Sequence, residues 1–181
     1  MLSSIILISG KAESGKDTLA SVLKILFEED NQKVLILHFA DLLKFICSQY
    51  FNWNGTKDEF GREILQTKGT EFRKYDENFW VKFIYDFIQA QFPNEWDRYI
   101  IPDFRYPNEY EYLQNNGMKC ITIRISKISD TENRLTEIQK SHDSETLLDN
   151  FKFDYYVTFR EGHIVKDNRY IKALYDKIKA Y

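Results

Sequence analysis

The nonapeptide GKAESGKDT, residues 10–18, decides the fold. It follows a short isoleucine-rich run, residues 3–9, that is typical of a buried strand. It precedes residues 18–29, where apolar side chains recur at helical spacing. The phosphate-binding P-loop has this pattern: a glycine, four further residues and then Gly-Lys, placed between a strand and a helix. A glycine turn that arose by chance would not need to lie between a strand and a helix, so the P-loop is the better interpretation. Backbone N–H groups and the helix N-terminus then surround a β-phosphate, and Lys16 spans the β- and γ-phosphates.

This pattern predicts an ATP-binding loop that also contains the strongest catalytic candidate, Lys16. The expected ATP-binding residues are Gly10, Lys11, Ser14, Gly15, Lys16, Asp17 and Thr18. Asp17 departs from the pattern, which has Ser or Thr at that position to bind Mg²⁺. A carboxylate beside phosphates has to be neutralised, so we favour a metal-linked Asp17 and a Thr18 that contacts phosphate. The alternative is that Asp17 only stabilises the first helical turn through the helix dipole.

Length and composition favour one domain, residues 1–181, with a net charge of −3. The charge gives no reason to expect a nucleic-acid binder, which usually has a basic face. The apolar run at residues 5–8 is too short to cross a membrane and is a poor signal peptide. Cys47 and Cys120 form no metal-binding pattern and suit a reducing compartment. We therefore expect a cytoplasmic protein.

Strands and helices alternate along the chain. Strands are expected at residues 3–9, 33–39, 99–102, 119–125 and 154–159, and helices at 18–29, 59–67, 78–91, 108–116 and 169–180, with another helix capped by Asp41. Such alternation predicts a five-stranded parallel sheet covered on both faces, a three-layer α/β fold. Asp103 ends the third strand, at the sheet edge where ligands bind, and is the second candidate Mg²⁺ ligand; Arg105 follows on the same side.

Residues 41–92 contain a group of candidate acceptor-binding side chains. Arg62 and Arg73 supply the planar donors that a phosphate needs, and Gln66 and Trp80 offer a hydrogen bond and an apolar surface to a base. Taken alone, the charged residues are better explained as a solvated helix face and Trp80 as core. Residues 127–145 form a polar, aperiodic stretch with Arg134 and His142. Its length favours a lid that excludes water during phosphoryl transfer over an ordinary surface loop.

Five motifs in register resemble the deoxynucleoside monophosphate kinases typical of phages. They extend from about residue 5 to 160. They are residues 14–18, Phe39-Ala40-Asp41 with Leu43-Lys44, residues 62–73 with Trp80-Val81, residues 103–109, and residues 141–145 with Phe153-Asp154-Tyr155.

The resemblance implies an ATP- and Mg²⁺-dependent transfer of phosphate to a deoxynucleoside monophosphate within a P-loop kinase fold. It implies that Lys16 and Thr18 hold ATP phosphates. It also implies an acceptor site, and the full set of acceptor candidates is Asp41, Lys44, Arg62, Gln66, Arg73, Trp80, Asp103 and Arg105. Arg62, Arg73 and Arg105 are expected to join Lys16 in catalysis by cancelling repulsion between the two anionic substrates.

Several alternatives remain open from the sequence. The family pattern has an asparagine near the end of the fifth strand, where this chain has Phe159 and Arg160, so the adenine contact is not assigned. Phosphomevalonate kinase shares the Gly-Lys-Asp loop and the Asp-x-Arg strand end. A non-catalytic P-loop switch would need no acceptor-side arginines. A homodimer is a further option.

Overall fold

The computed structural model describes residues 4–91, 95–128, 141–160, 163–165 and 168–181. A sheet of five parallel strands, in the order β2-β3-β1-β4-β5, forms its centre. The strands are β1 (Ser4–Ser9), β2 (Val34–Ile36), β3 (Arg98–Ile101), β4 (Lys119–Ile128) and β5 (Tyr155–Arg160). The register places Ile6 of β1 opposite Ile100 of β3 and Ile121 of β4. The predicted α/β fold with five parallel strands is confirmed.

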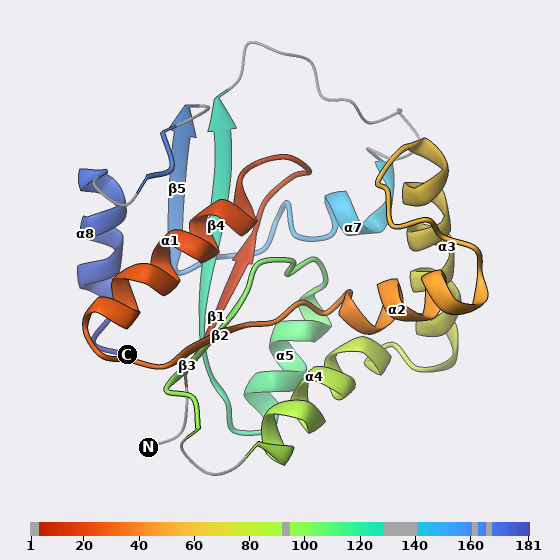
Figure 1. Ribbon diagram of the computed structural model, residues 1–181, viewed down its shortest axis with the longest axis horizontal. Coiled ribbons are helices and arrows are strands. Elements are labelled where there is room, and N and C mark those ends of the chain that lie inside the picture. Colours follow the sequence, from red (N-terminus) through yellow and green to blue (C-terminus); the bar gives the residue numbers. More distant parts are fainter. Residues whose placement is uncertain (1–3, 92–94, 129–140, 161–162, 166–167) are drawn as a thin grey trace.

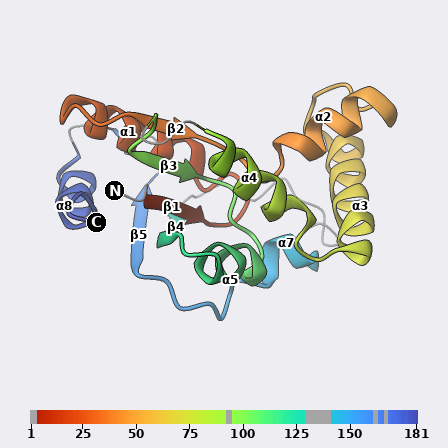
Figure 2. The same ribbon diagram turned by 90° about the horizontal axis from the view of Figure 1, so that it is seen from below.

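Helices cover both faces of this sheet (Figures 1 and 2). Ile6 and Ile8 of β1 point to the core shared with α1 (Lys16–Glu29) and α8 (Arg169–Ile178). Ile5 and Leu7 point to the opposite core, shared with α4 (Phe79–Ala90) and α5 (Pro107–Asn115). Alternate residues of a strand face opposite sides, so a strand buried on both faces is apolar throughout.

A third, smaller core lies in the region 41–92, between α2 (Asp41–Tyr50), α3 (Glu59–Tyr75) and the start of α4. In both ribbon views α2 and α3 lie on the side of the molecule away from α8. The helix predicted at 59–67 continues to Tyr75, with Arg73 and Lys74 in its last turn, where cations complement the helix dipole. This extension puts Arg62, Gln66 and Arg73 on one helix.

Other predicted boundaries were also wrong, and the strand predicted at residues 33–39 is the shorter β2, Val34–Ile36. Asp41 is not the N-cap of α2: Ala40 holds that position, and the Asp41 carboxylate accepts from the backbone N–H of His38 at 3.1 Å. The fourth strand was predicted to end at residue 125 but continues to Ile128, so it enters the segment assigned to the lid. Most of that segment, residues 129–140 with Arg134, lies outside the described residues, and α7 (Asp143–Thr146) follows. Among the described residues, no helix is long and apolar enough to cross a membrane.

Candidate active site

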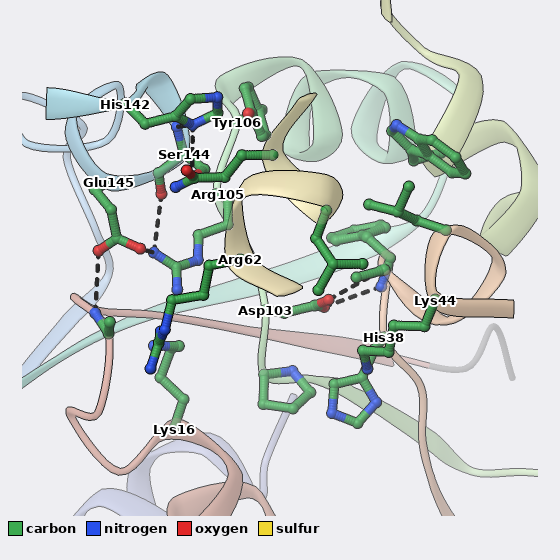
Figure 3. A pocket seen from close by; sticks show the side chains of 18 of the residues that line it. Lys16, His38, Lys44, Arg62, Asp103, Arg105, Tyr106, His142, Ser144 and Glu145 are labelled. Atoms are coloured by element: carbon green, nitrogen blue, oxygen red, sulfur yellow. Dashed lines mark hydrogen bonds and ion pairs between the residues drawn. The ribbon is translucent and has the colours of Figure 1, made fainter. Parts of the chain in front are cut away.

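A cavity of about 470 Å³ opens at the carboxyl edge of the sheet, where open parallel sheets bind ligands. Its walls come from the loop before α1, the segments after β2 and β3, and helices α2, α3 and α7. Figure 3 shows Lys16, Arg62 and Arg105 directed into this space from separate elements, with Asp103, His38 and Lys44 beside them. The predicted residues that line it are Lys16, Asp17, Lys44, Arg62, Gln66, Arg73, Trp80, Asp103, Arg105 and His142.

The P-loop is shaped by its two glycines and by Lys16. Gly15 has a positive φ of 89°, which suits glycine, and a Cβ on Gly10 would lie 2.5 Å from the Ile125 carbonyl oxygen. Lys16 is buried and donates to the carbonyl oxygens of Gly10 and Lys11 at 2.9 and 2.7 Å. Burial, reinforced by the nearby Arg105, lowers the pKa of Lys16 to about 7. Anionic phosphates would restore its charge, as expected of a phosphate-binding lysine.

A second hollow of about 240 Å³ adjoins the other side of the P-loop. Ser14, Gly15 and Thr18 line it together with Lys127, Phe159, Arg160 and Ile164. The hydroxyl of Ser14 is buried and has no hydrogen-bond partner among the described residues. The loop therefore separates two spaces, and the predicted ATP-binding residues divide between them.

His38, which the sequence analysis missed, connects Asp17 to Asp41. Its Nε2 lies 3.0 Å from Asp17 Oδ1 and its Nδ1 lies 3.5 Å from Asp41 Oδ2. Burial opposes the charge of the imidazole, but these two carboxylates outweigh it and raise the pKa of His38 to about 9. Asp41 itself is absent from the cavity lining; it pairs with Lys44 at 3.0 Å. A histidine two residues after the end of β2 and next to Phe39-Ala40-Asp41 was the available signal.

Asp103 has a structural task at the end of β3. Its two carboxylate oxygens accept the backbone N–H groups of Phe39 and Ala40 at 2.9 and 3.0 Å. It thus fixes the start of α2 against the neighbouring strand. Metal binding by Asp103 stays a prediction.

Two arginines approach the P-loop. Arg105 Nη1 donates to Glu145 Oε1 at 2.5 Å and to the Ser144 carbonyl oxygen at 2.9 Å. Arg62, on α3, donates through Nη2 to Glu13 of the P-loop at 3.3 Å. Guanidinium groups held in this way are available to anions between the loop and α3.

Arg73 lines the same cavity and is held by two groups of the protein. Its guanidinium lies 3.7 Å from the ring centroid of Tyr106, and Nη2 is 3.8 Å from Glu109 Oε1. Glu109 is buried and accepts the backbone N–H groups of Arg105 and Tyr106 at 2.8 and 3.1 Å. Burial raises the pKa of Glu109 to about 7. Pro107 and Glu109 at the first and third helical positions are the capping pattern that could have identified this carboxylate.

Trp80 fits both interpretations offered for it. It is buried, packs against Phe72 and Phe79, and donates from Nε1 to the Gly69 carbonyl oxygen at 3.2 Å. It also lines the cavity, with Gln66 nearby on the same wall. His142 Nε2 lies 3.3 Å from Thr70 Oγ1, so the residue that precedes α7 contacts α3.

A P-loop that faces arginines from other elements is typical of P-loop phosphotransferases. The family model for deoxynucleotide monophosphate kinase matches residues 25–152, and the chain belongs to that family. The protein is accordingly a kinase that uses ATP and a deoxynucleotide substrate. The match begins after the P-loop, so the loop is independent support for this class.

Solved structures share the fold. A putative kinase from Chloroflexus aurantiacus j-10-fl superposes with a TM-score of 0.52 at 15% identity, covering 99% of this chain and 95% of that one. The Mycobacterium tuberculosis APS kinase CysC in complex with AMPPNP and APS gives 0.50 at 11% identity, covering 99% and 96%. No curated protein matches the chain. At these identities the structural likeness supports the fold alone.

Proposed function

We propose that the cavity is the acceptor site, in which a deoxynucleoside monophosphate presents its phosphate to ATP held by the P-loop. The observation that carries this assignment is the meeting of Lys16, Arg62, Arg73 and Arg105 around one space of about 470 Å³. Two anionic substrates need such a concentration of cations before their reacting atoms approach. A P-loop switch without an acceptor has no use for Arg73, which lies away from the loop.

The transfer is an in-line displacement at the γ-phosphorus by an oxygen of the acceptor phosphate. The acceptor is already anionic, so positioning and charge neutralisation supply the catalysis and no strong base is required. Lys16 holds the donor phosphates, Arg73 holds the acceptor phosphate, and Arg62 and Arg105 stabilise the charge that develops between them.

Mg²⁺ fits the exposed Asp17 carboxylate at this edge of the sheet better than Asp103, both of whose oxygens already accept backbone N–H groups. In nucleotide sites Mg²⁺ takes one or two carboxylates together with phosphate oxygens and water. Asp17 and Asp103 both line the cavity near Lys16, and the Asp17 side chain is exposed enough to exchange its contact with His38 for a hydrated cation. Bound there, Mg²⁺ would neutralise phosphate charge.

The remaining walls suit a nucleobase better than a small aliphatic acceptor. Leu43, Leu65 and Trp80 give the cavity an apolar side, and Gln66 adds a hydrogen-bonding amide. Phosphomevalonate would leave this surface unused. For ATP, the hollow bounded by Phe159 and Ile164 on the other side of the loop is the proposed site of the base.

A coupled ADP-release assay tests the proposal. The purified protein is offered ATP, Mg²⁺ and a panel of deoxynucleoside monophosphates, ribonucleoside monophosphates and phosphomevalonate, with Lys16→Ala as the inactive control. We expect turnover with at least one deoxynucleotide. Faster turnover with phosphomevalonate than with every nucleotide would overturn the acceptor assignment. Cytoplasmic location and a homodimer stay predictions, and light scattering tests the latter.

A further inference from the structure

Glu145 links two parts of the site that are far apart in the sequence. Its side chain is 8% exposed, and its Oε2 accepts the backbone N–H of Ala12, in the P-loop, at 3.0 Å. Its Oε1 accepts from Arg105, which follows β3. Its backbone carbonyl oxygen accepts from Lys11 Nζ at 2.5 Å. Figure 3 shows the carboxylate beside the cavity, with Arg105 on its inner side.

The contacts of Arg105 explain how the Glu145 carboxylate fixes the orientation of the Arg105 guanidinium. The two N–H groups of Nη1 are both used, one by Glu145 Oε1 and one by the Ser144 carbonyl oxygen. A guanidinium carries five N–H donors in a rigid plane, so fixing Nη1 fixes the other two nitrogens. Nη2 and Nε are the remaining pair, and a pair of parallel donors is the arrangement that binds a phosphate bidentately.

The charges explain why a carboxylate is needed there. Arg105 and Lys16 are close enough for Arg105 to lower the pKa of the lysine, and Glu145 acts in the opposite direction. Two cations facing the same small space repel each other until phosphates arrive. A buried anion bound to one of them lets both remain in place beforehand, which reduces the reorganisation required at the moment of reaction.

We propose that Glu145 is a positioning residue for phosphoryl transfer, which acts by orienting Arg105 and by holding the P-loop at Ala12. This rests on the proposed function, because the phosphate that Arg105 meets is the one in transfer. Glu145 does not itself contact substrate: each oxygen is already occupied by a donor of the protein. Both contacts come from one side chain of α7, so the last residue of the predicted lid segment connects the donor and acceptor sides.

A double-mutant cycle between Glu145 and Arg105 tests the proposal. Glu145→Gln offers one acceptor oxygen to two donors, so one contact is lost while the size is kept. We expect a loss of roughly ten- to a hundredfold in kcat/KM, mainly in kcat. In the Arg105→Ala background the same substitution should cost less than about threefold, because residues that act through each other are not additive. Glu28→Gln, in a surface pair with Lys24 on α1, is the matched control and should leave kcat/KM unchanged.

Two further measurements separate positioning from folding and from the proposed function. The Arg105 Nε–H resonance, identified by its loss in Arg105→Ala, should shift or broaden in Glu145→Gln even without an acceptor. Glu145→Asp keeps the charge but is too short to span both donors, so it should show the kinetic defect with a cooperative unfolding transition intact. Multiplicative effects in the cycle, or an unchanged Arg105 resonance, would overturn the proposal. Absence of turnover in the wild type with every nucleotide would instead count against the proposed function, and the resonance would still report on Glu145.

Discussion

Arg73→Ala separates binding of the acceptor from binding of ATP. Arg73 lies on α3, and its contacts within the protein are the ring of Tyr106 and the buried carboxylate of Glu109. Both hold the guanidinium in the cavity and neither belongs to the P-loop. Removing Arg73 should therefore weaken the acceptor and leave the KM for ATP within a few-fold.

The magnitude follows from what the side chain does. Loss of a charge-assisted, bidentate contact to phosphate costs roughly 1.5–3 kcal/mol, or about ten- to a hundredfold in acceptor kcat/KM. Arg73→Lys keeps the charge but loses the planar fork and most of the stacking on Tyr106, so it should recover only part of the loss. A full recovery by lysine would show that charge alone is needed.

Arg73→Ala also changes the ionisation of Glu109, and the experiment has to control for this second effect. Burial already raises the pKa of this carboxyl to about 7, and loss of Arg73 should raise it further. A carboxyl whose pKa is raised in the folded state contributes stability at low pH, and this contribution is lost as pH rises through the folded pKa. The free energy of unfolding of Arg73→Ala, relative to the wild type, should therefore fall further at pH 8 than at pH 6. Adding Glu109→Gln should remove that pH dependence, since an amide cannot ionise.

Steady-state kinetics with each substrate varied in turn, and urea unfolding at both pH values, measure the two effects. Glu109→Gln should restore stability to Arg73→Ala without restoring acceptor kcat/KM. If it restores both, the kinetic loss came from unfolding. If Arg73→Ala raises the KM for ATP as much as that for the acceptor, the assignment of Arg73 to the acceptor side is wrong.

Three further predictions concern other groups in the cavity. The pKa of Lys16 is about 7, so the wild-type protein should take up a proton when it binds ADP at pH 8, and the Lys16→Ala variant should not. Calorimetry in two buffers of different ionisation enthalpy measures this proton uptake. Equal uptake by the two proteins would contradict the role of Lys16. The pKa of His38 is raised to about 9, so its contribution to stability is complete below pH 6.5 and is lost as pH rises through 9. In metal-free buffer, His38→Ala should flatten this decline in the free energy of unfolding. An unchanged slope would refute the pairing of His38 with Asp17 and Asp41. Gln66→Ala should change the ranking among dTMP, dGMP and dCMP in the ADP-release assay, and an equal loss for all three would place Gln66 away from the base.

Rules that act over a few neighbouring residues were enough to predict the P-loop and the parallel sheet. The P-loop was found from a few adjacent residues because a strand, a glycine loop and a helix in succession leave little conformational freedom. The parallel sheet followed from the alternation of apolar strands and helices, since strands buried on both faces are apolar throughout. The carboxyl ends of such strands meet at one edge, so the meeting of Lys16, Asp103 and Arg105 was also predictable.

Contacts between distant segments were decided by the tertiary structure. The sequence alone determined the fold class, the phosphate loop and the group of cations at the sheet edge. It could not determine that Glu145 holds Arg105 across 40 residues, that His38 joins Asp17 to Asp41, or that Arg73 stacks on Tyr106 above Glu109. A salt bridge or a stacked ring depends on the separation and direction of two side chains, and these are set by how helices and loops pack, which residue spacing along the chain does not encode.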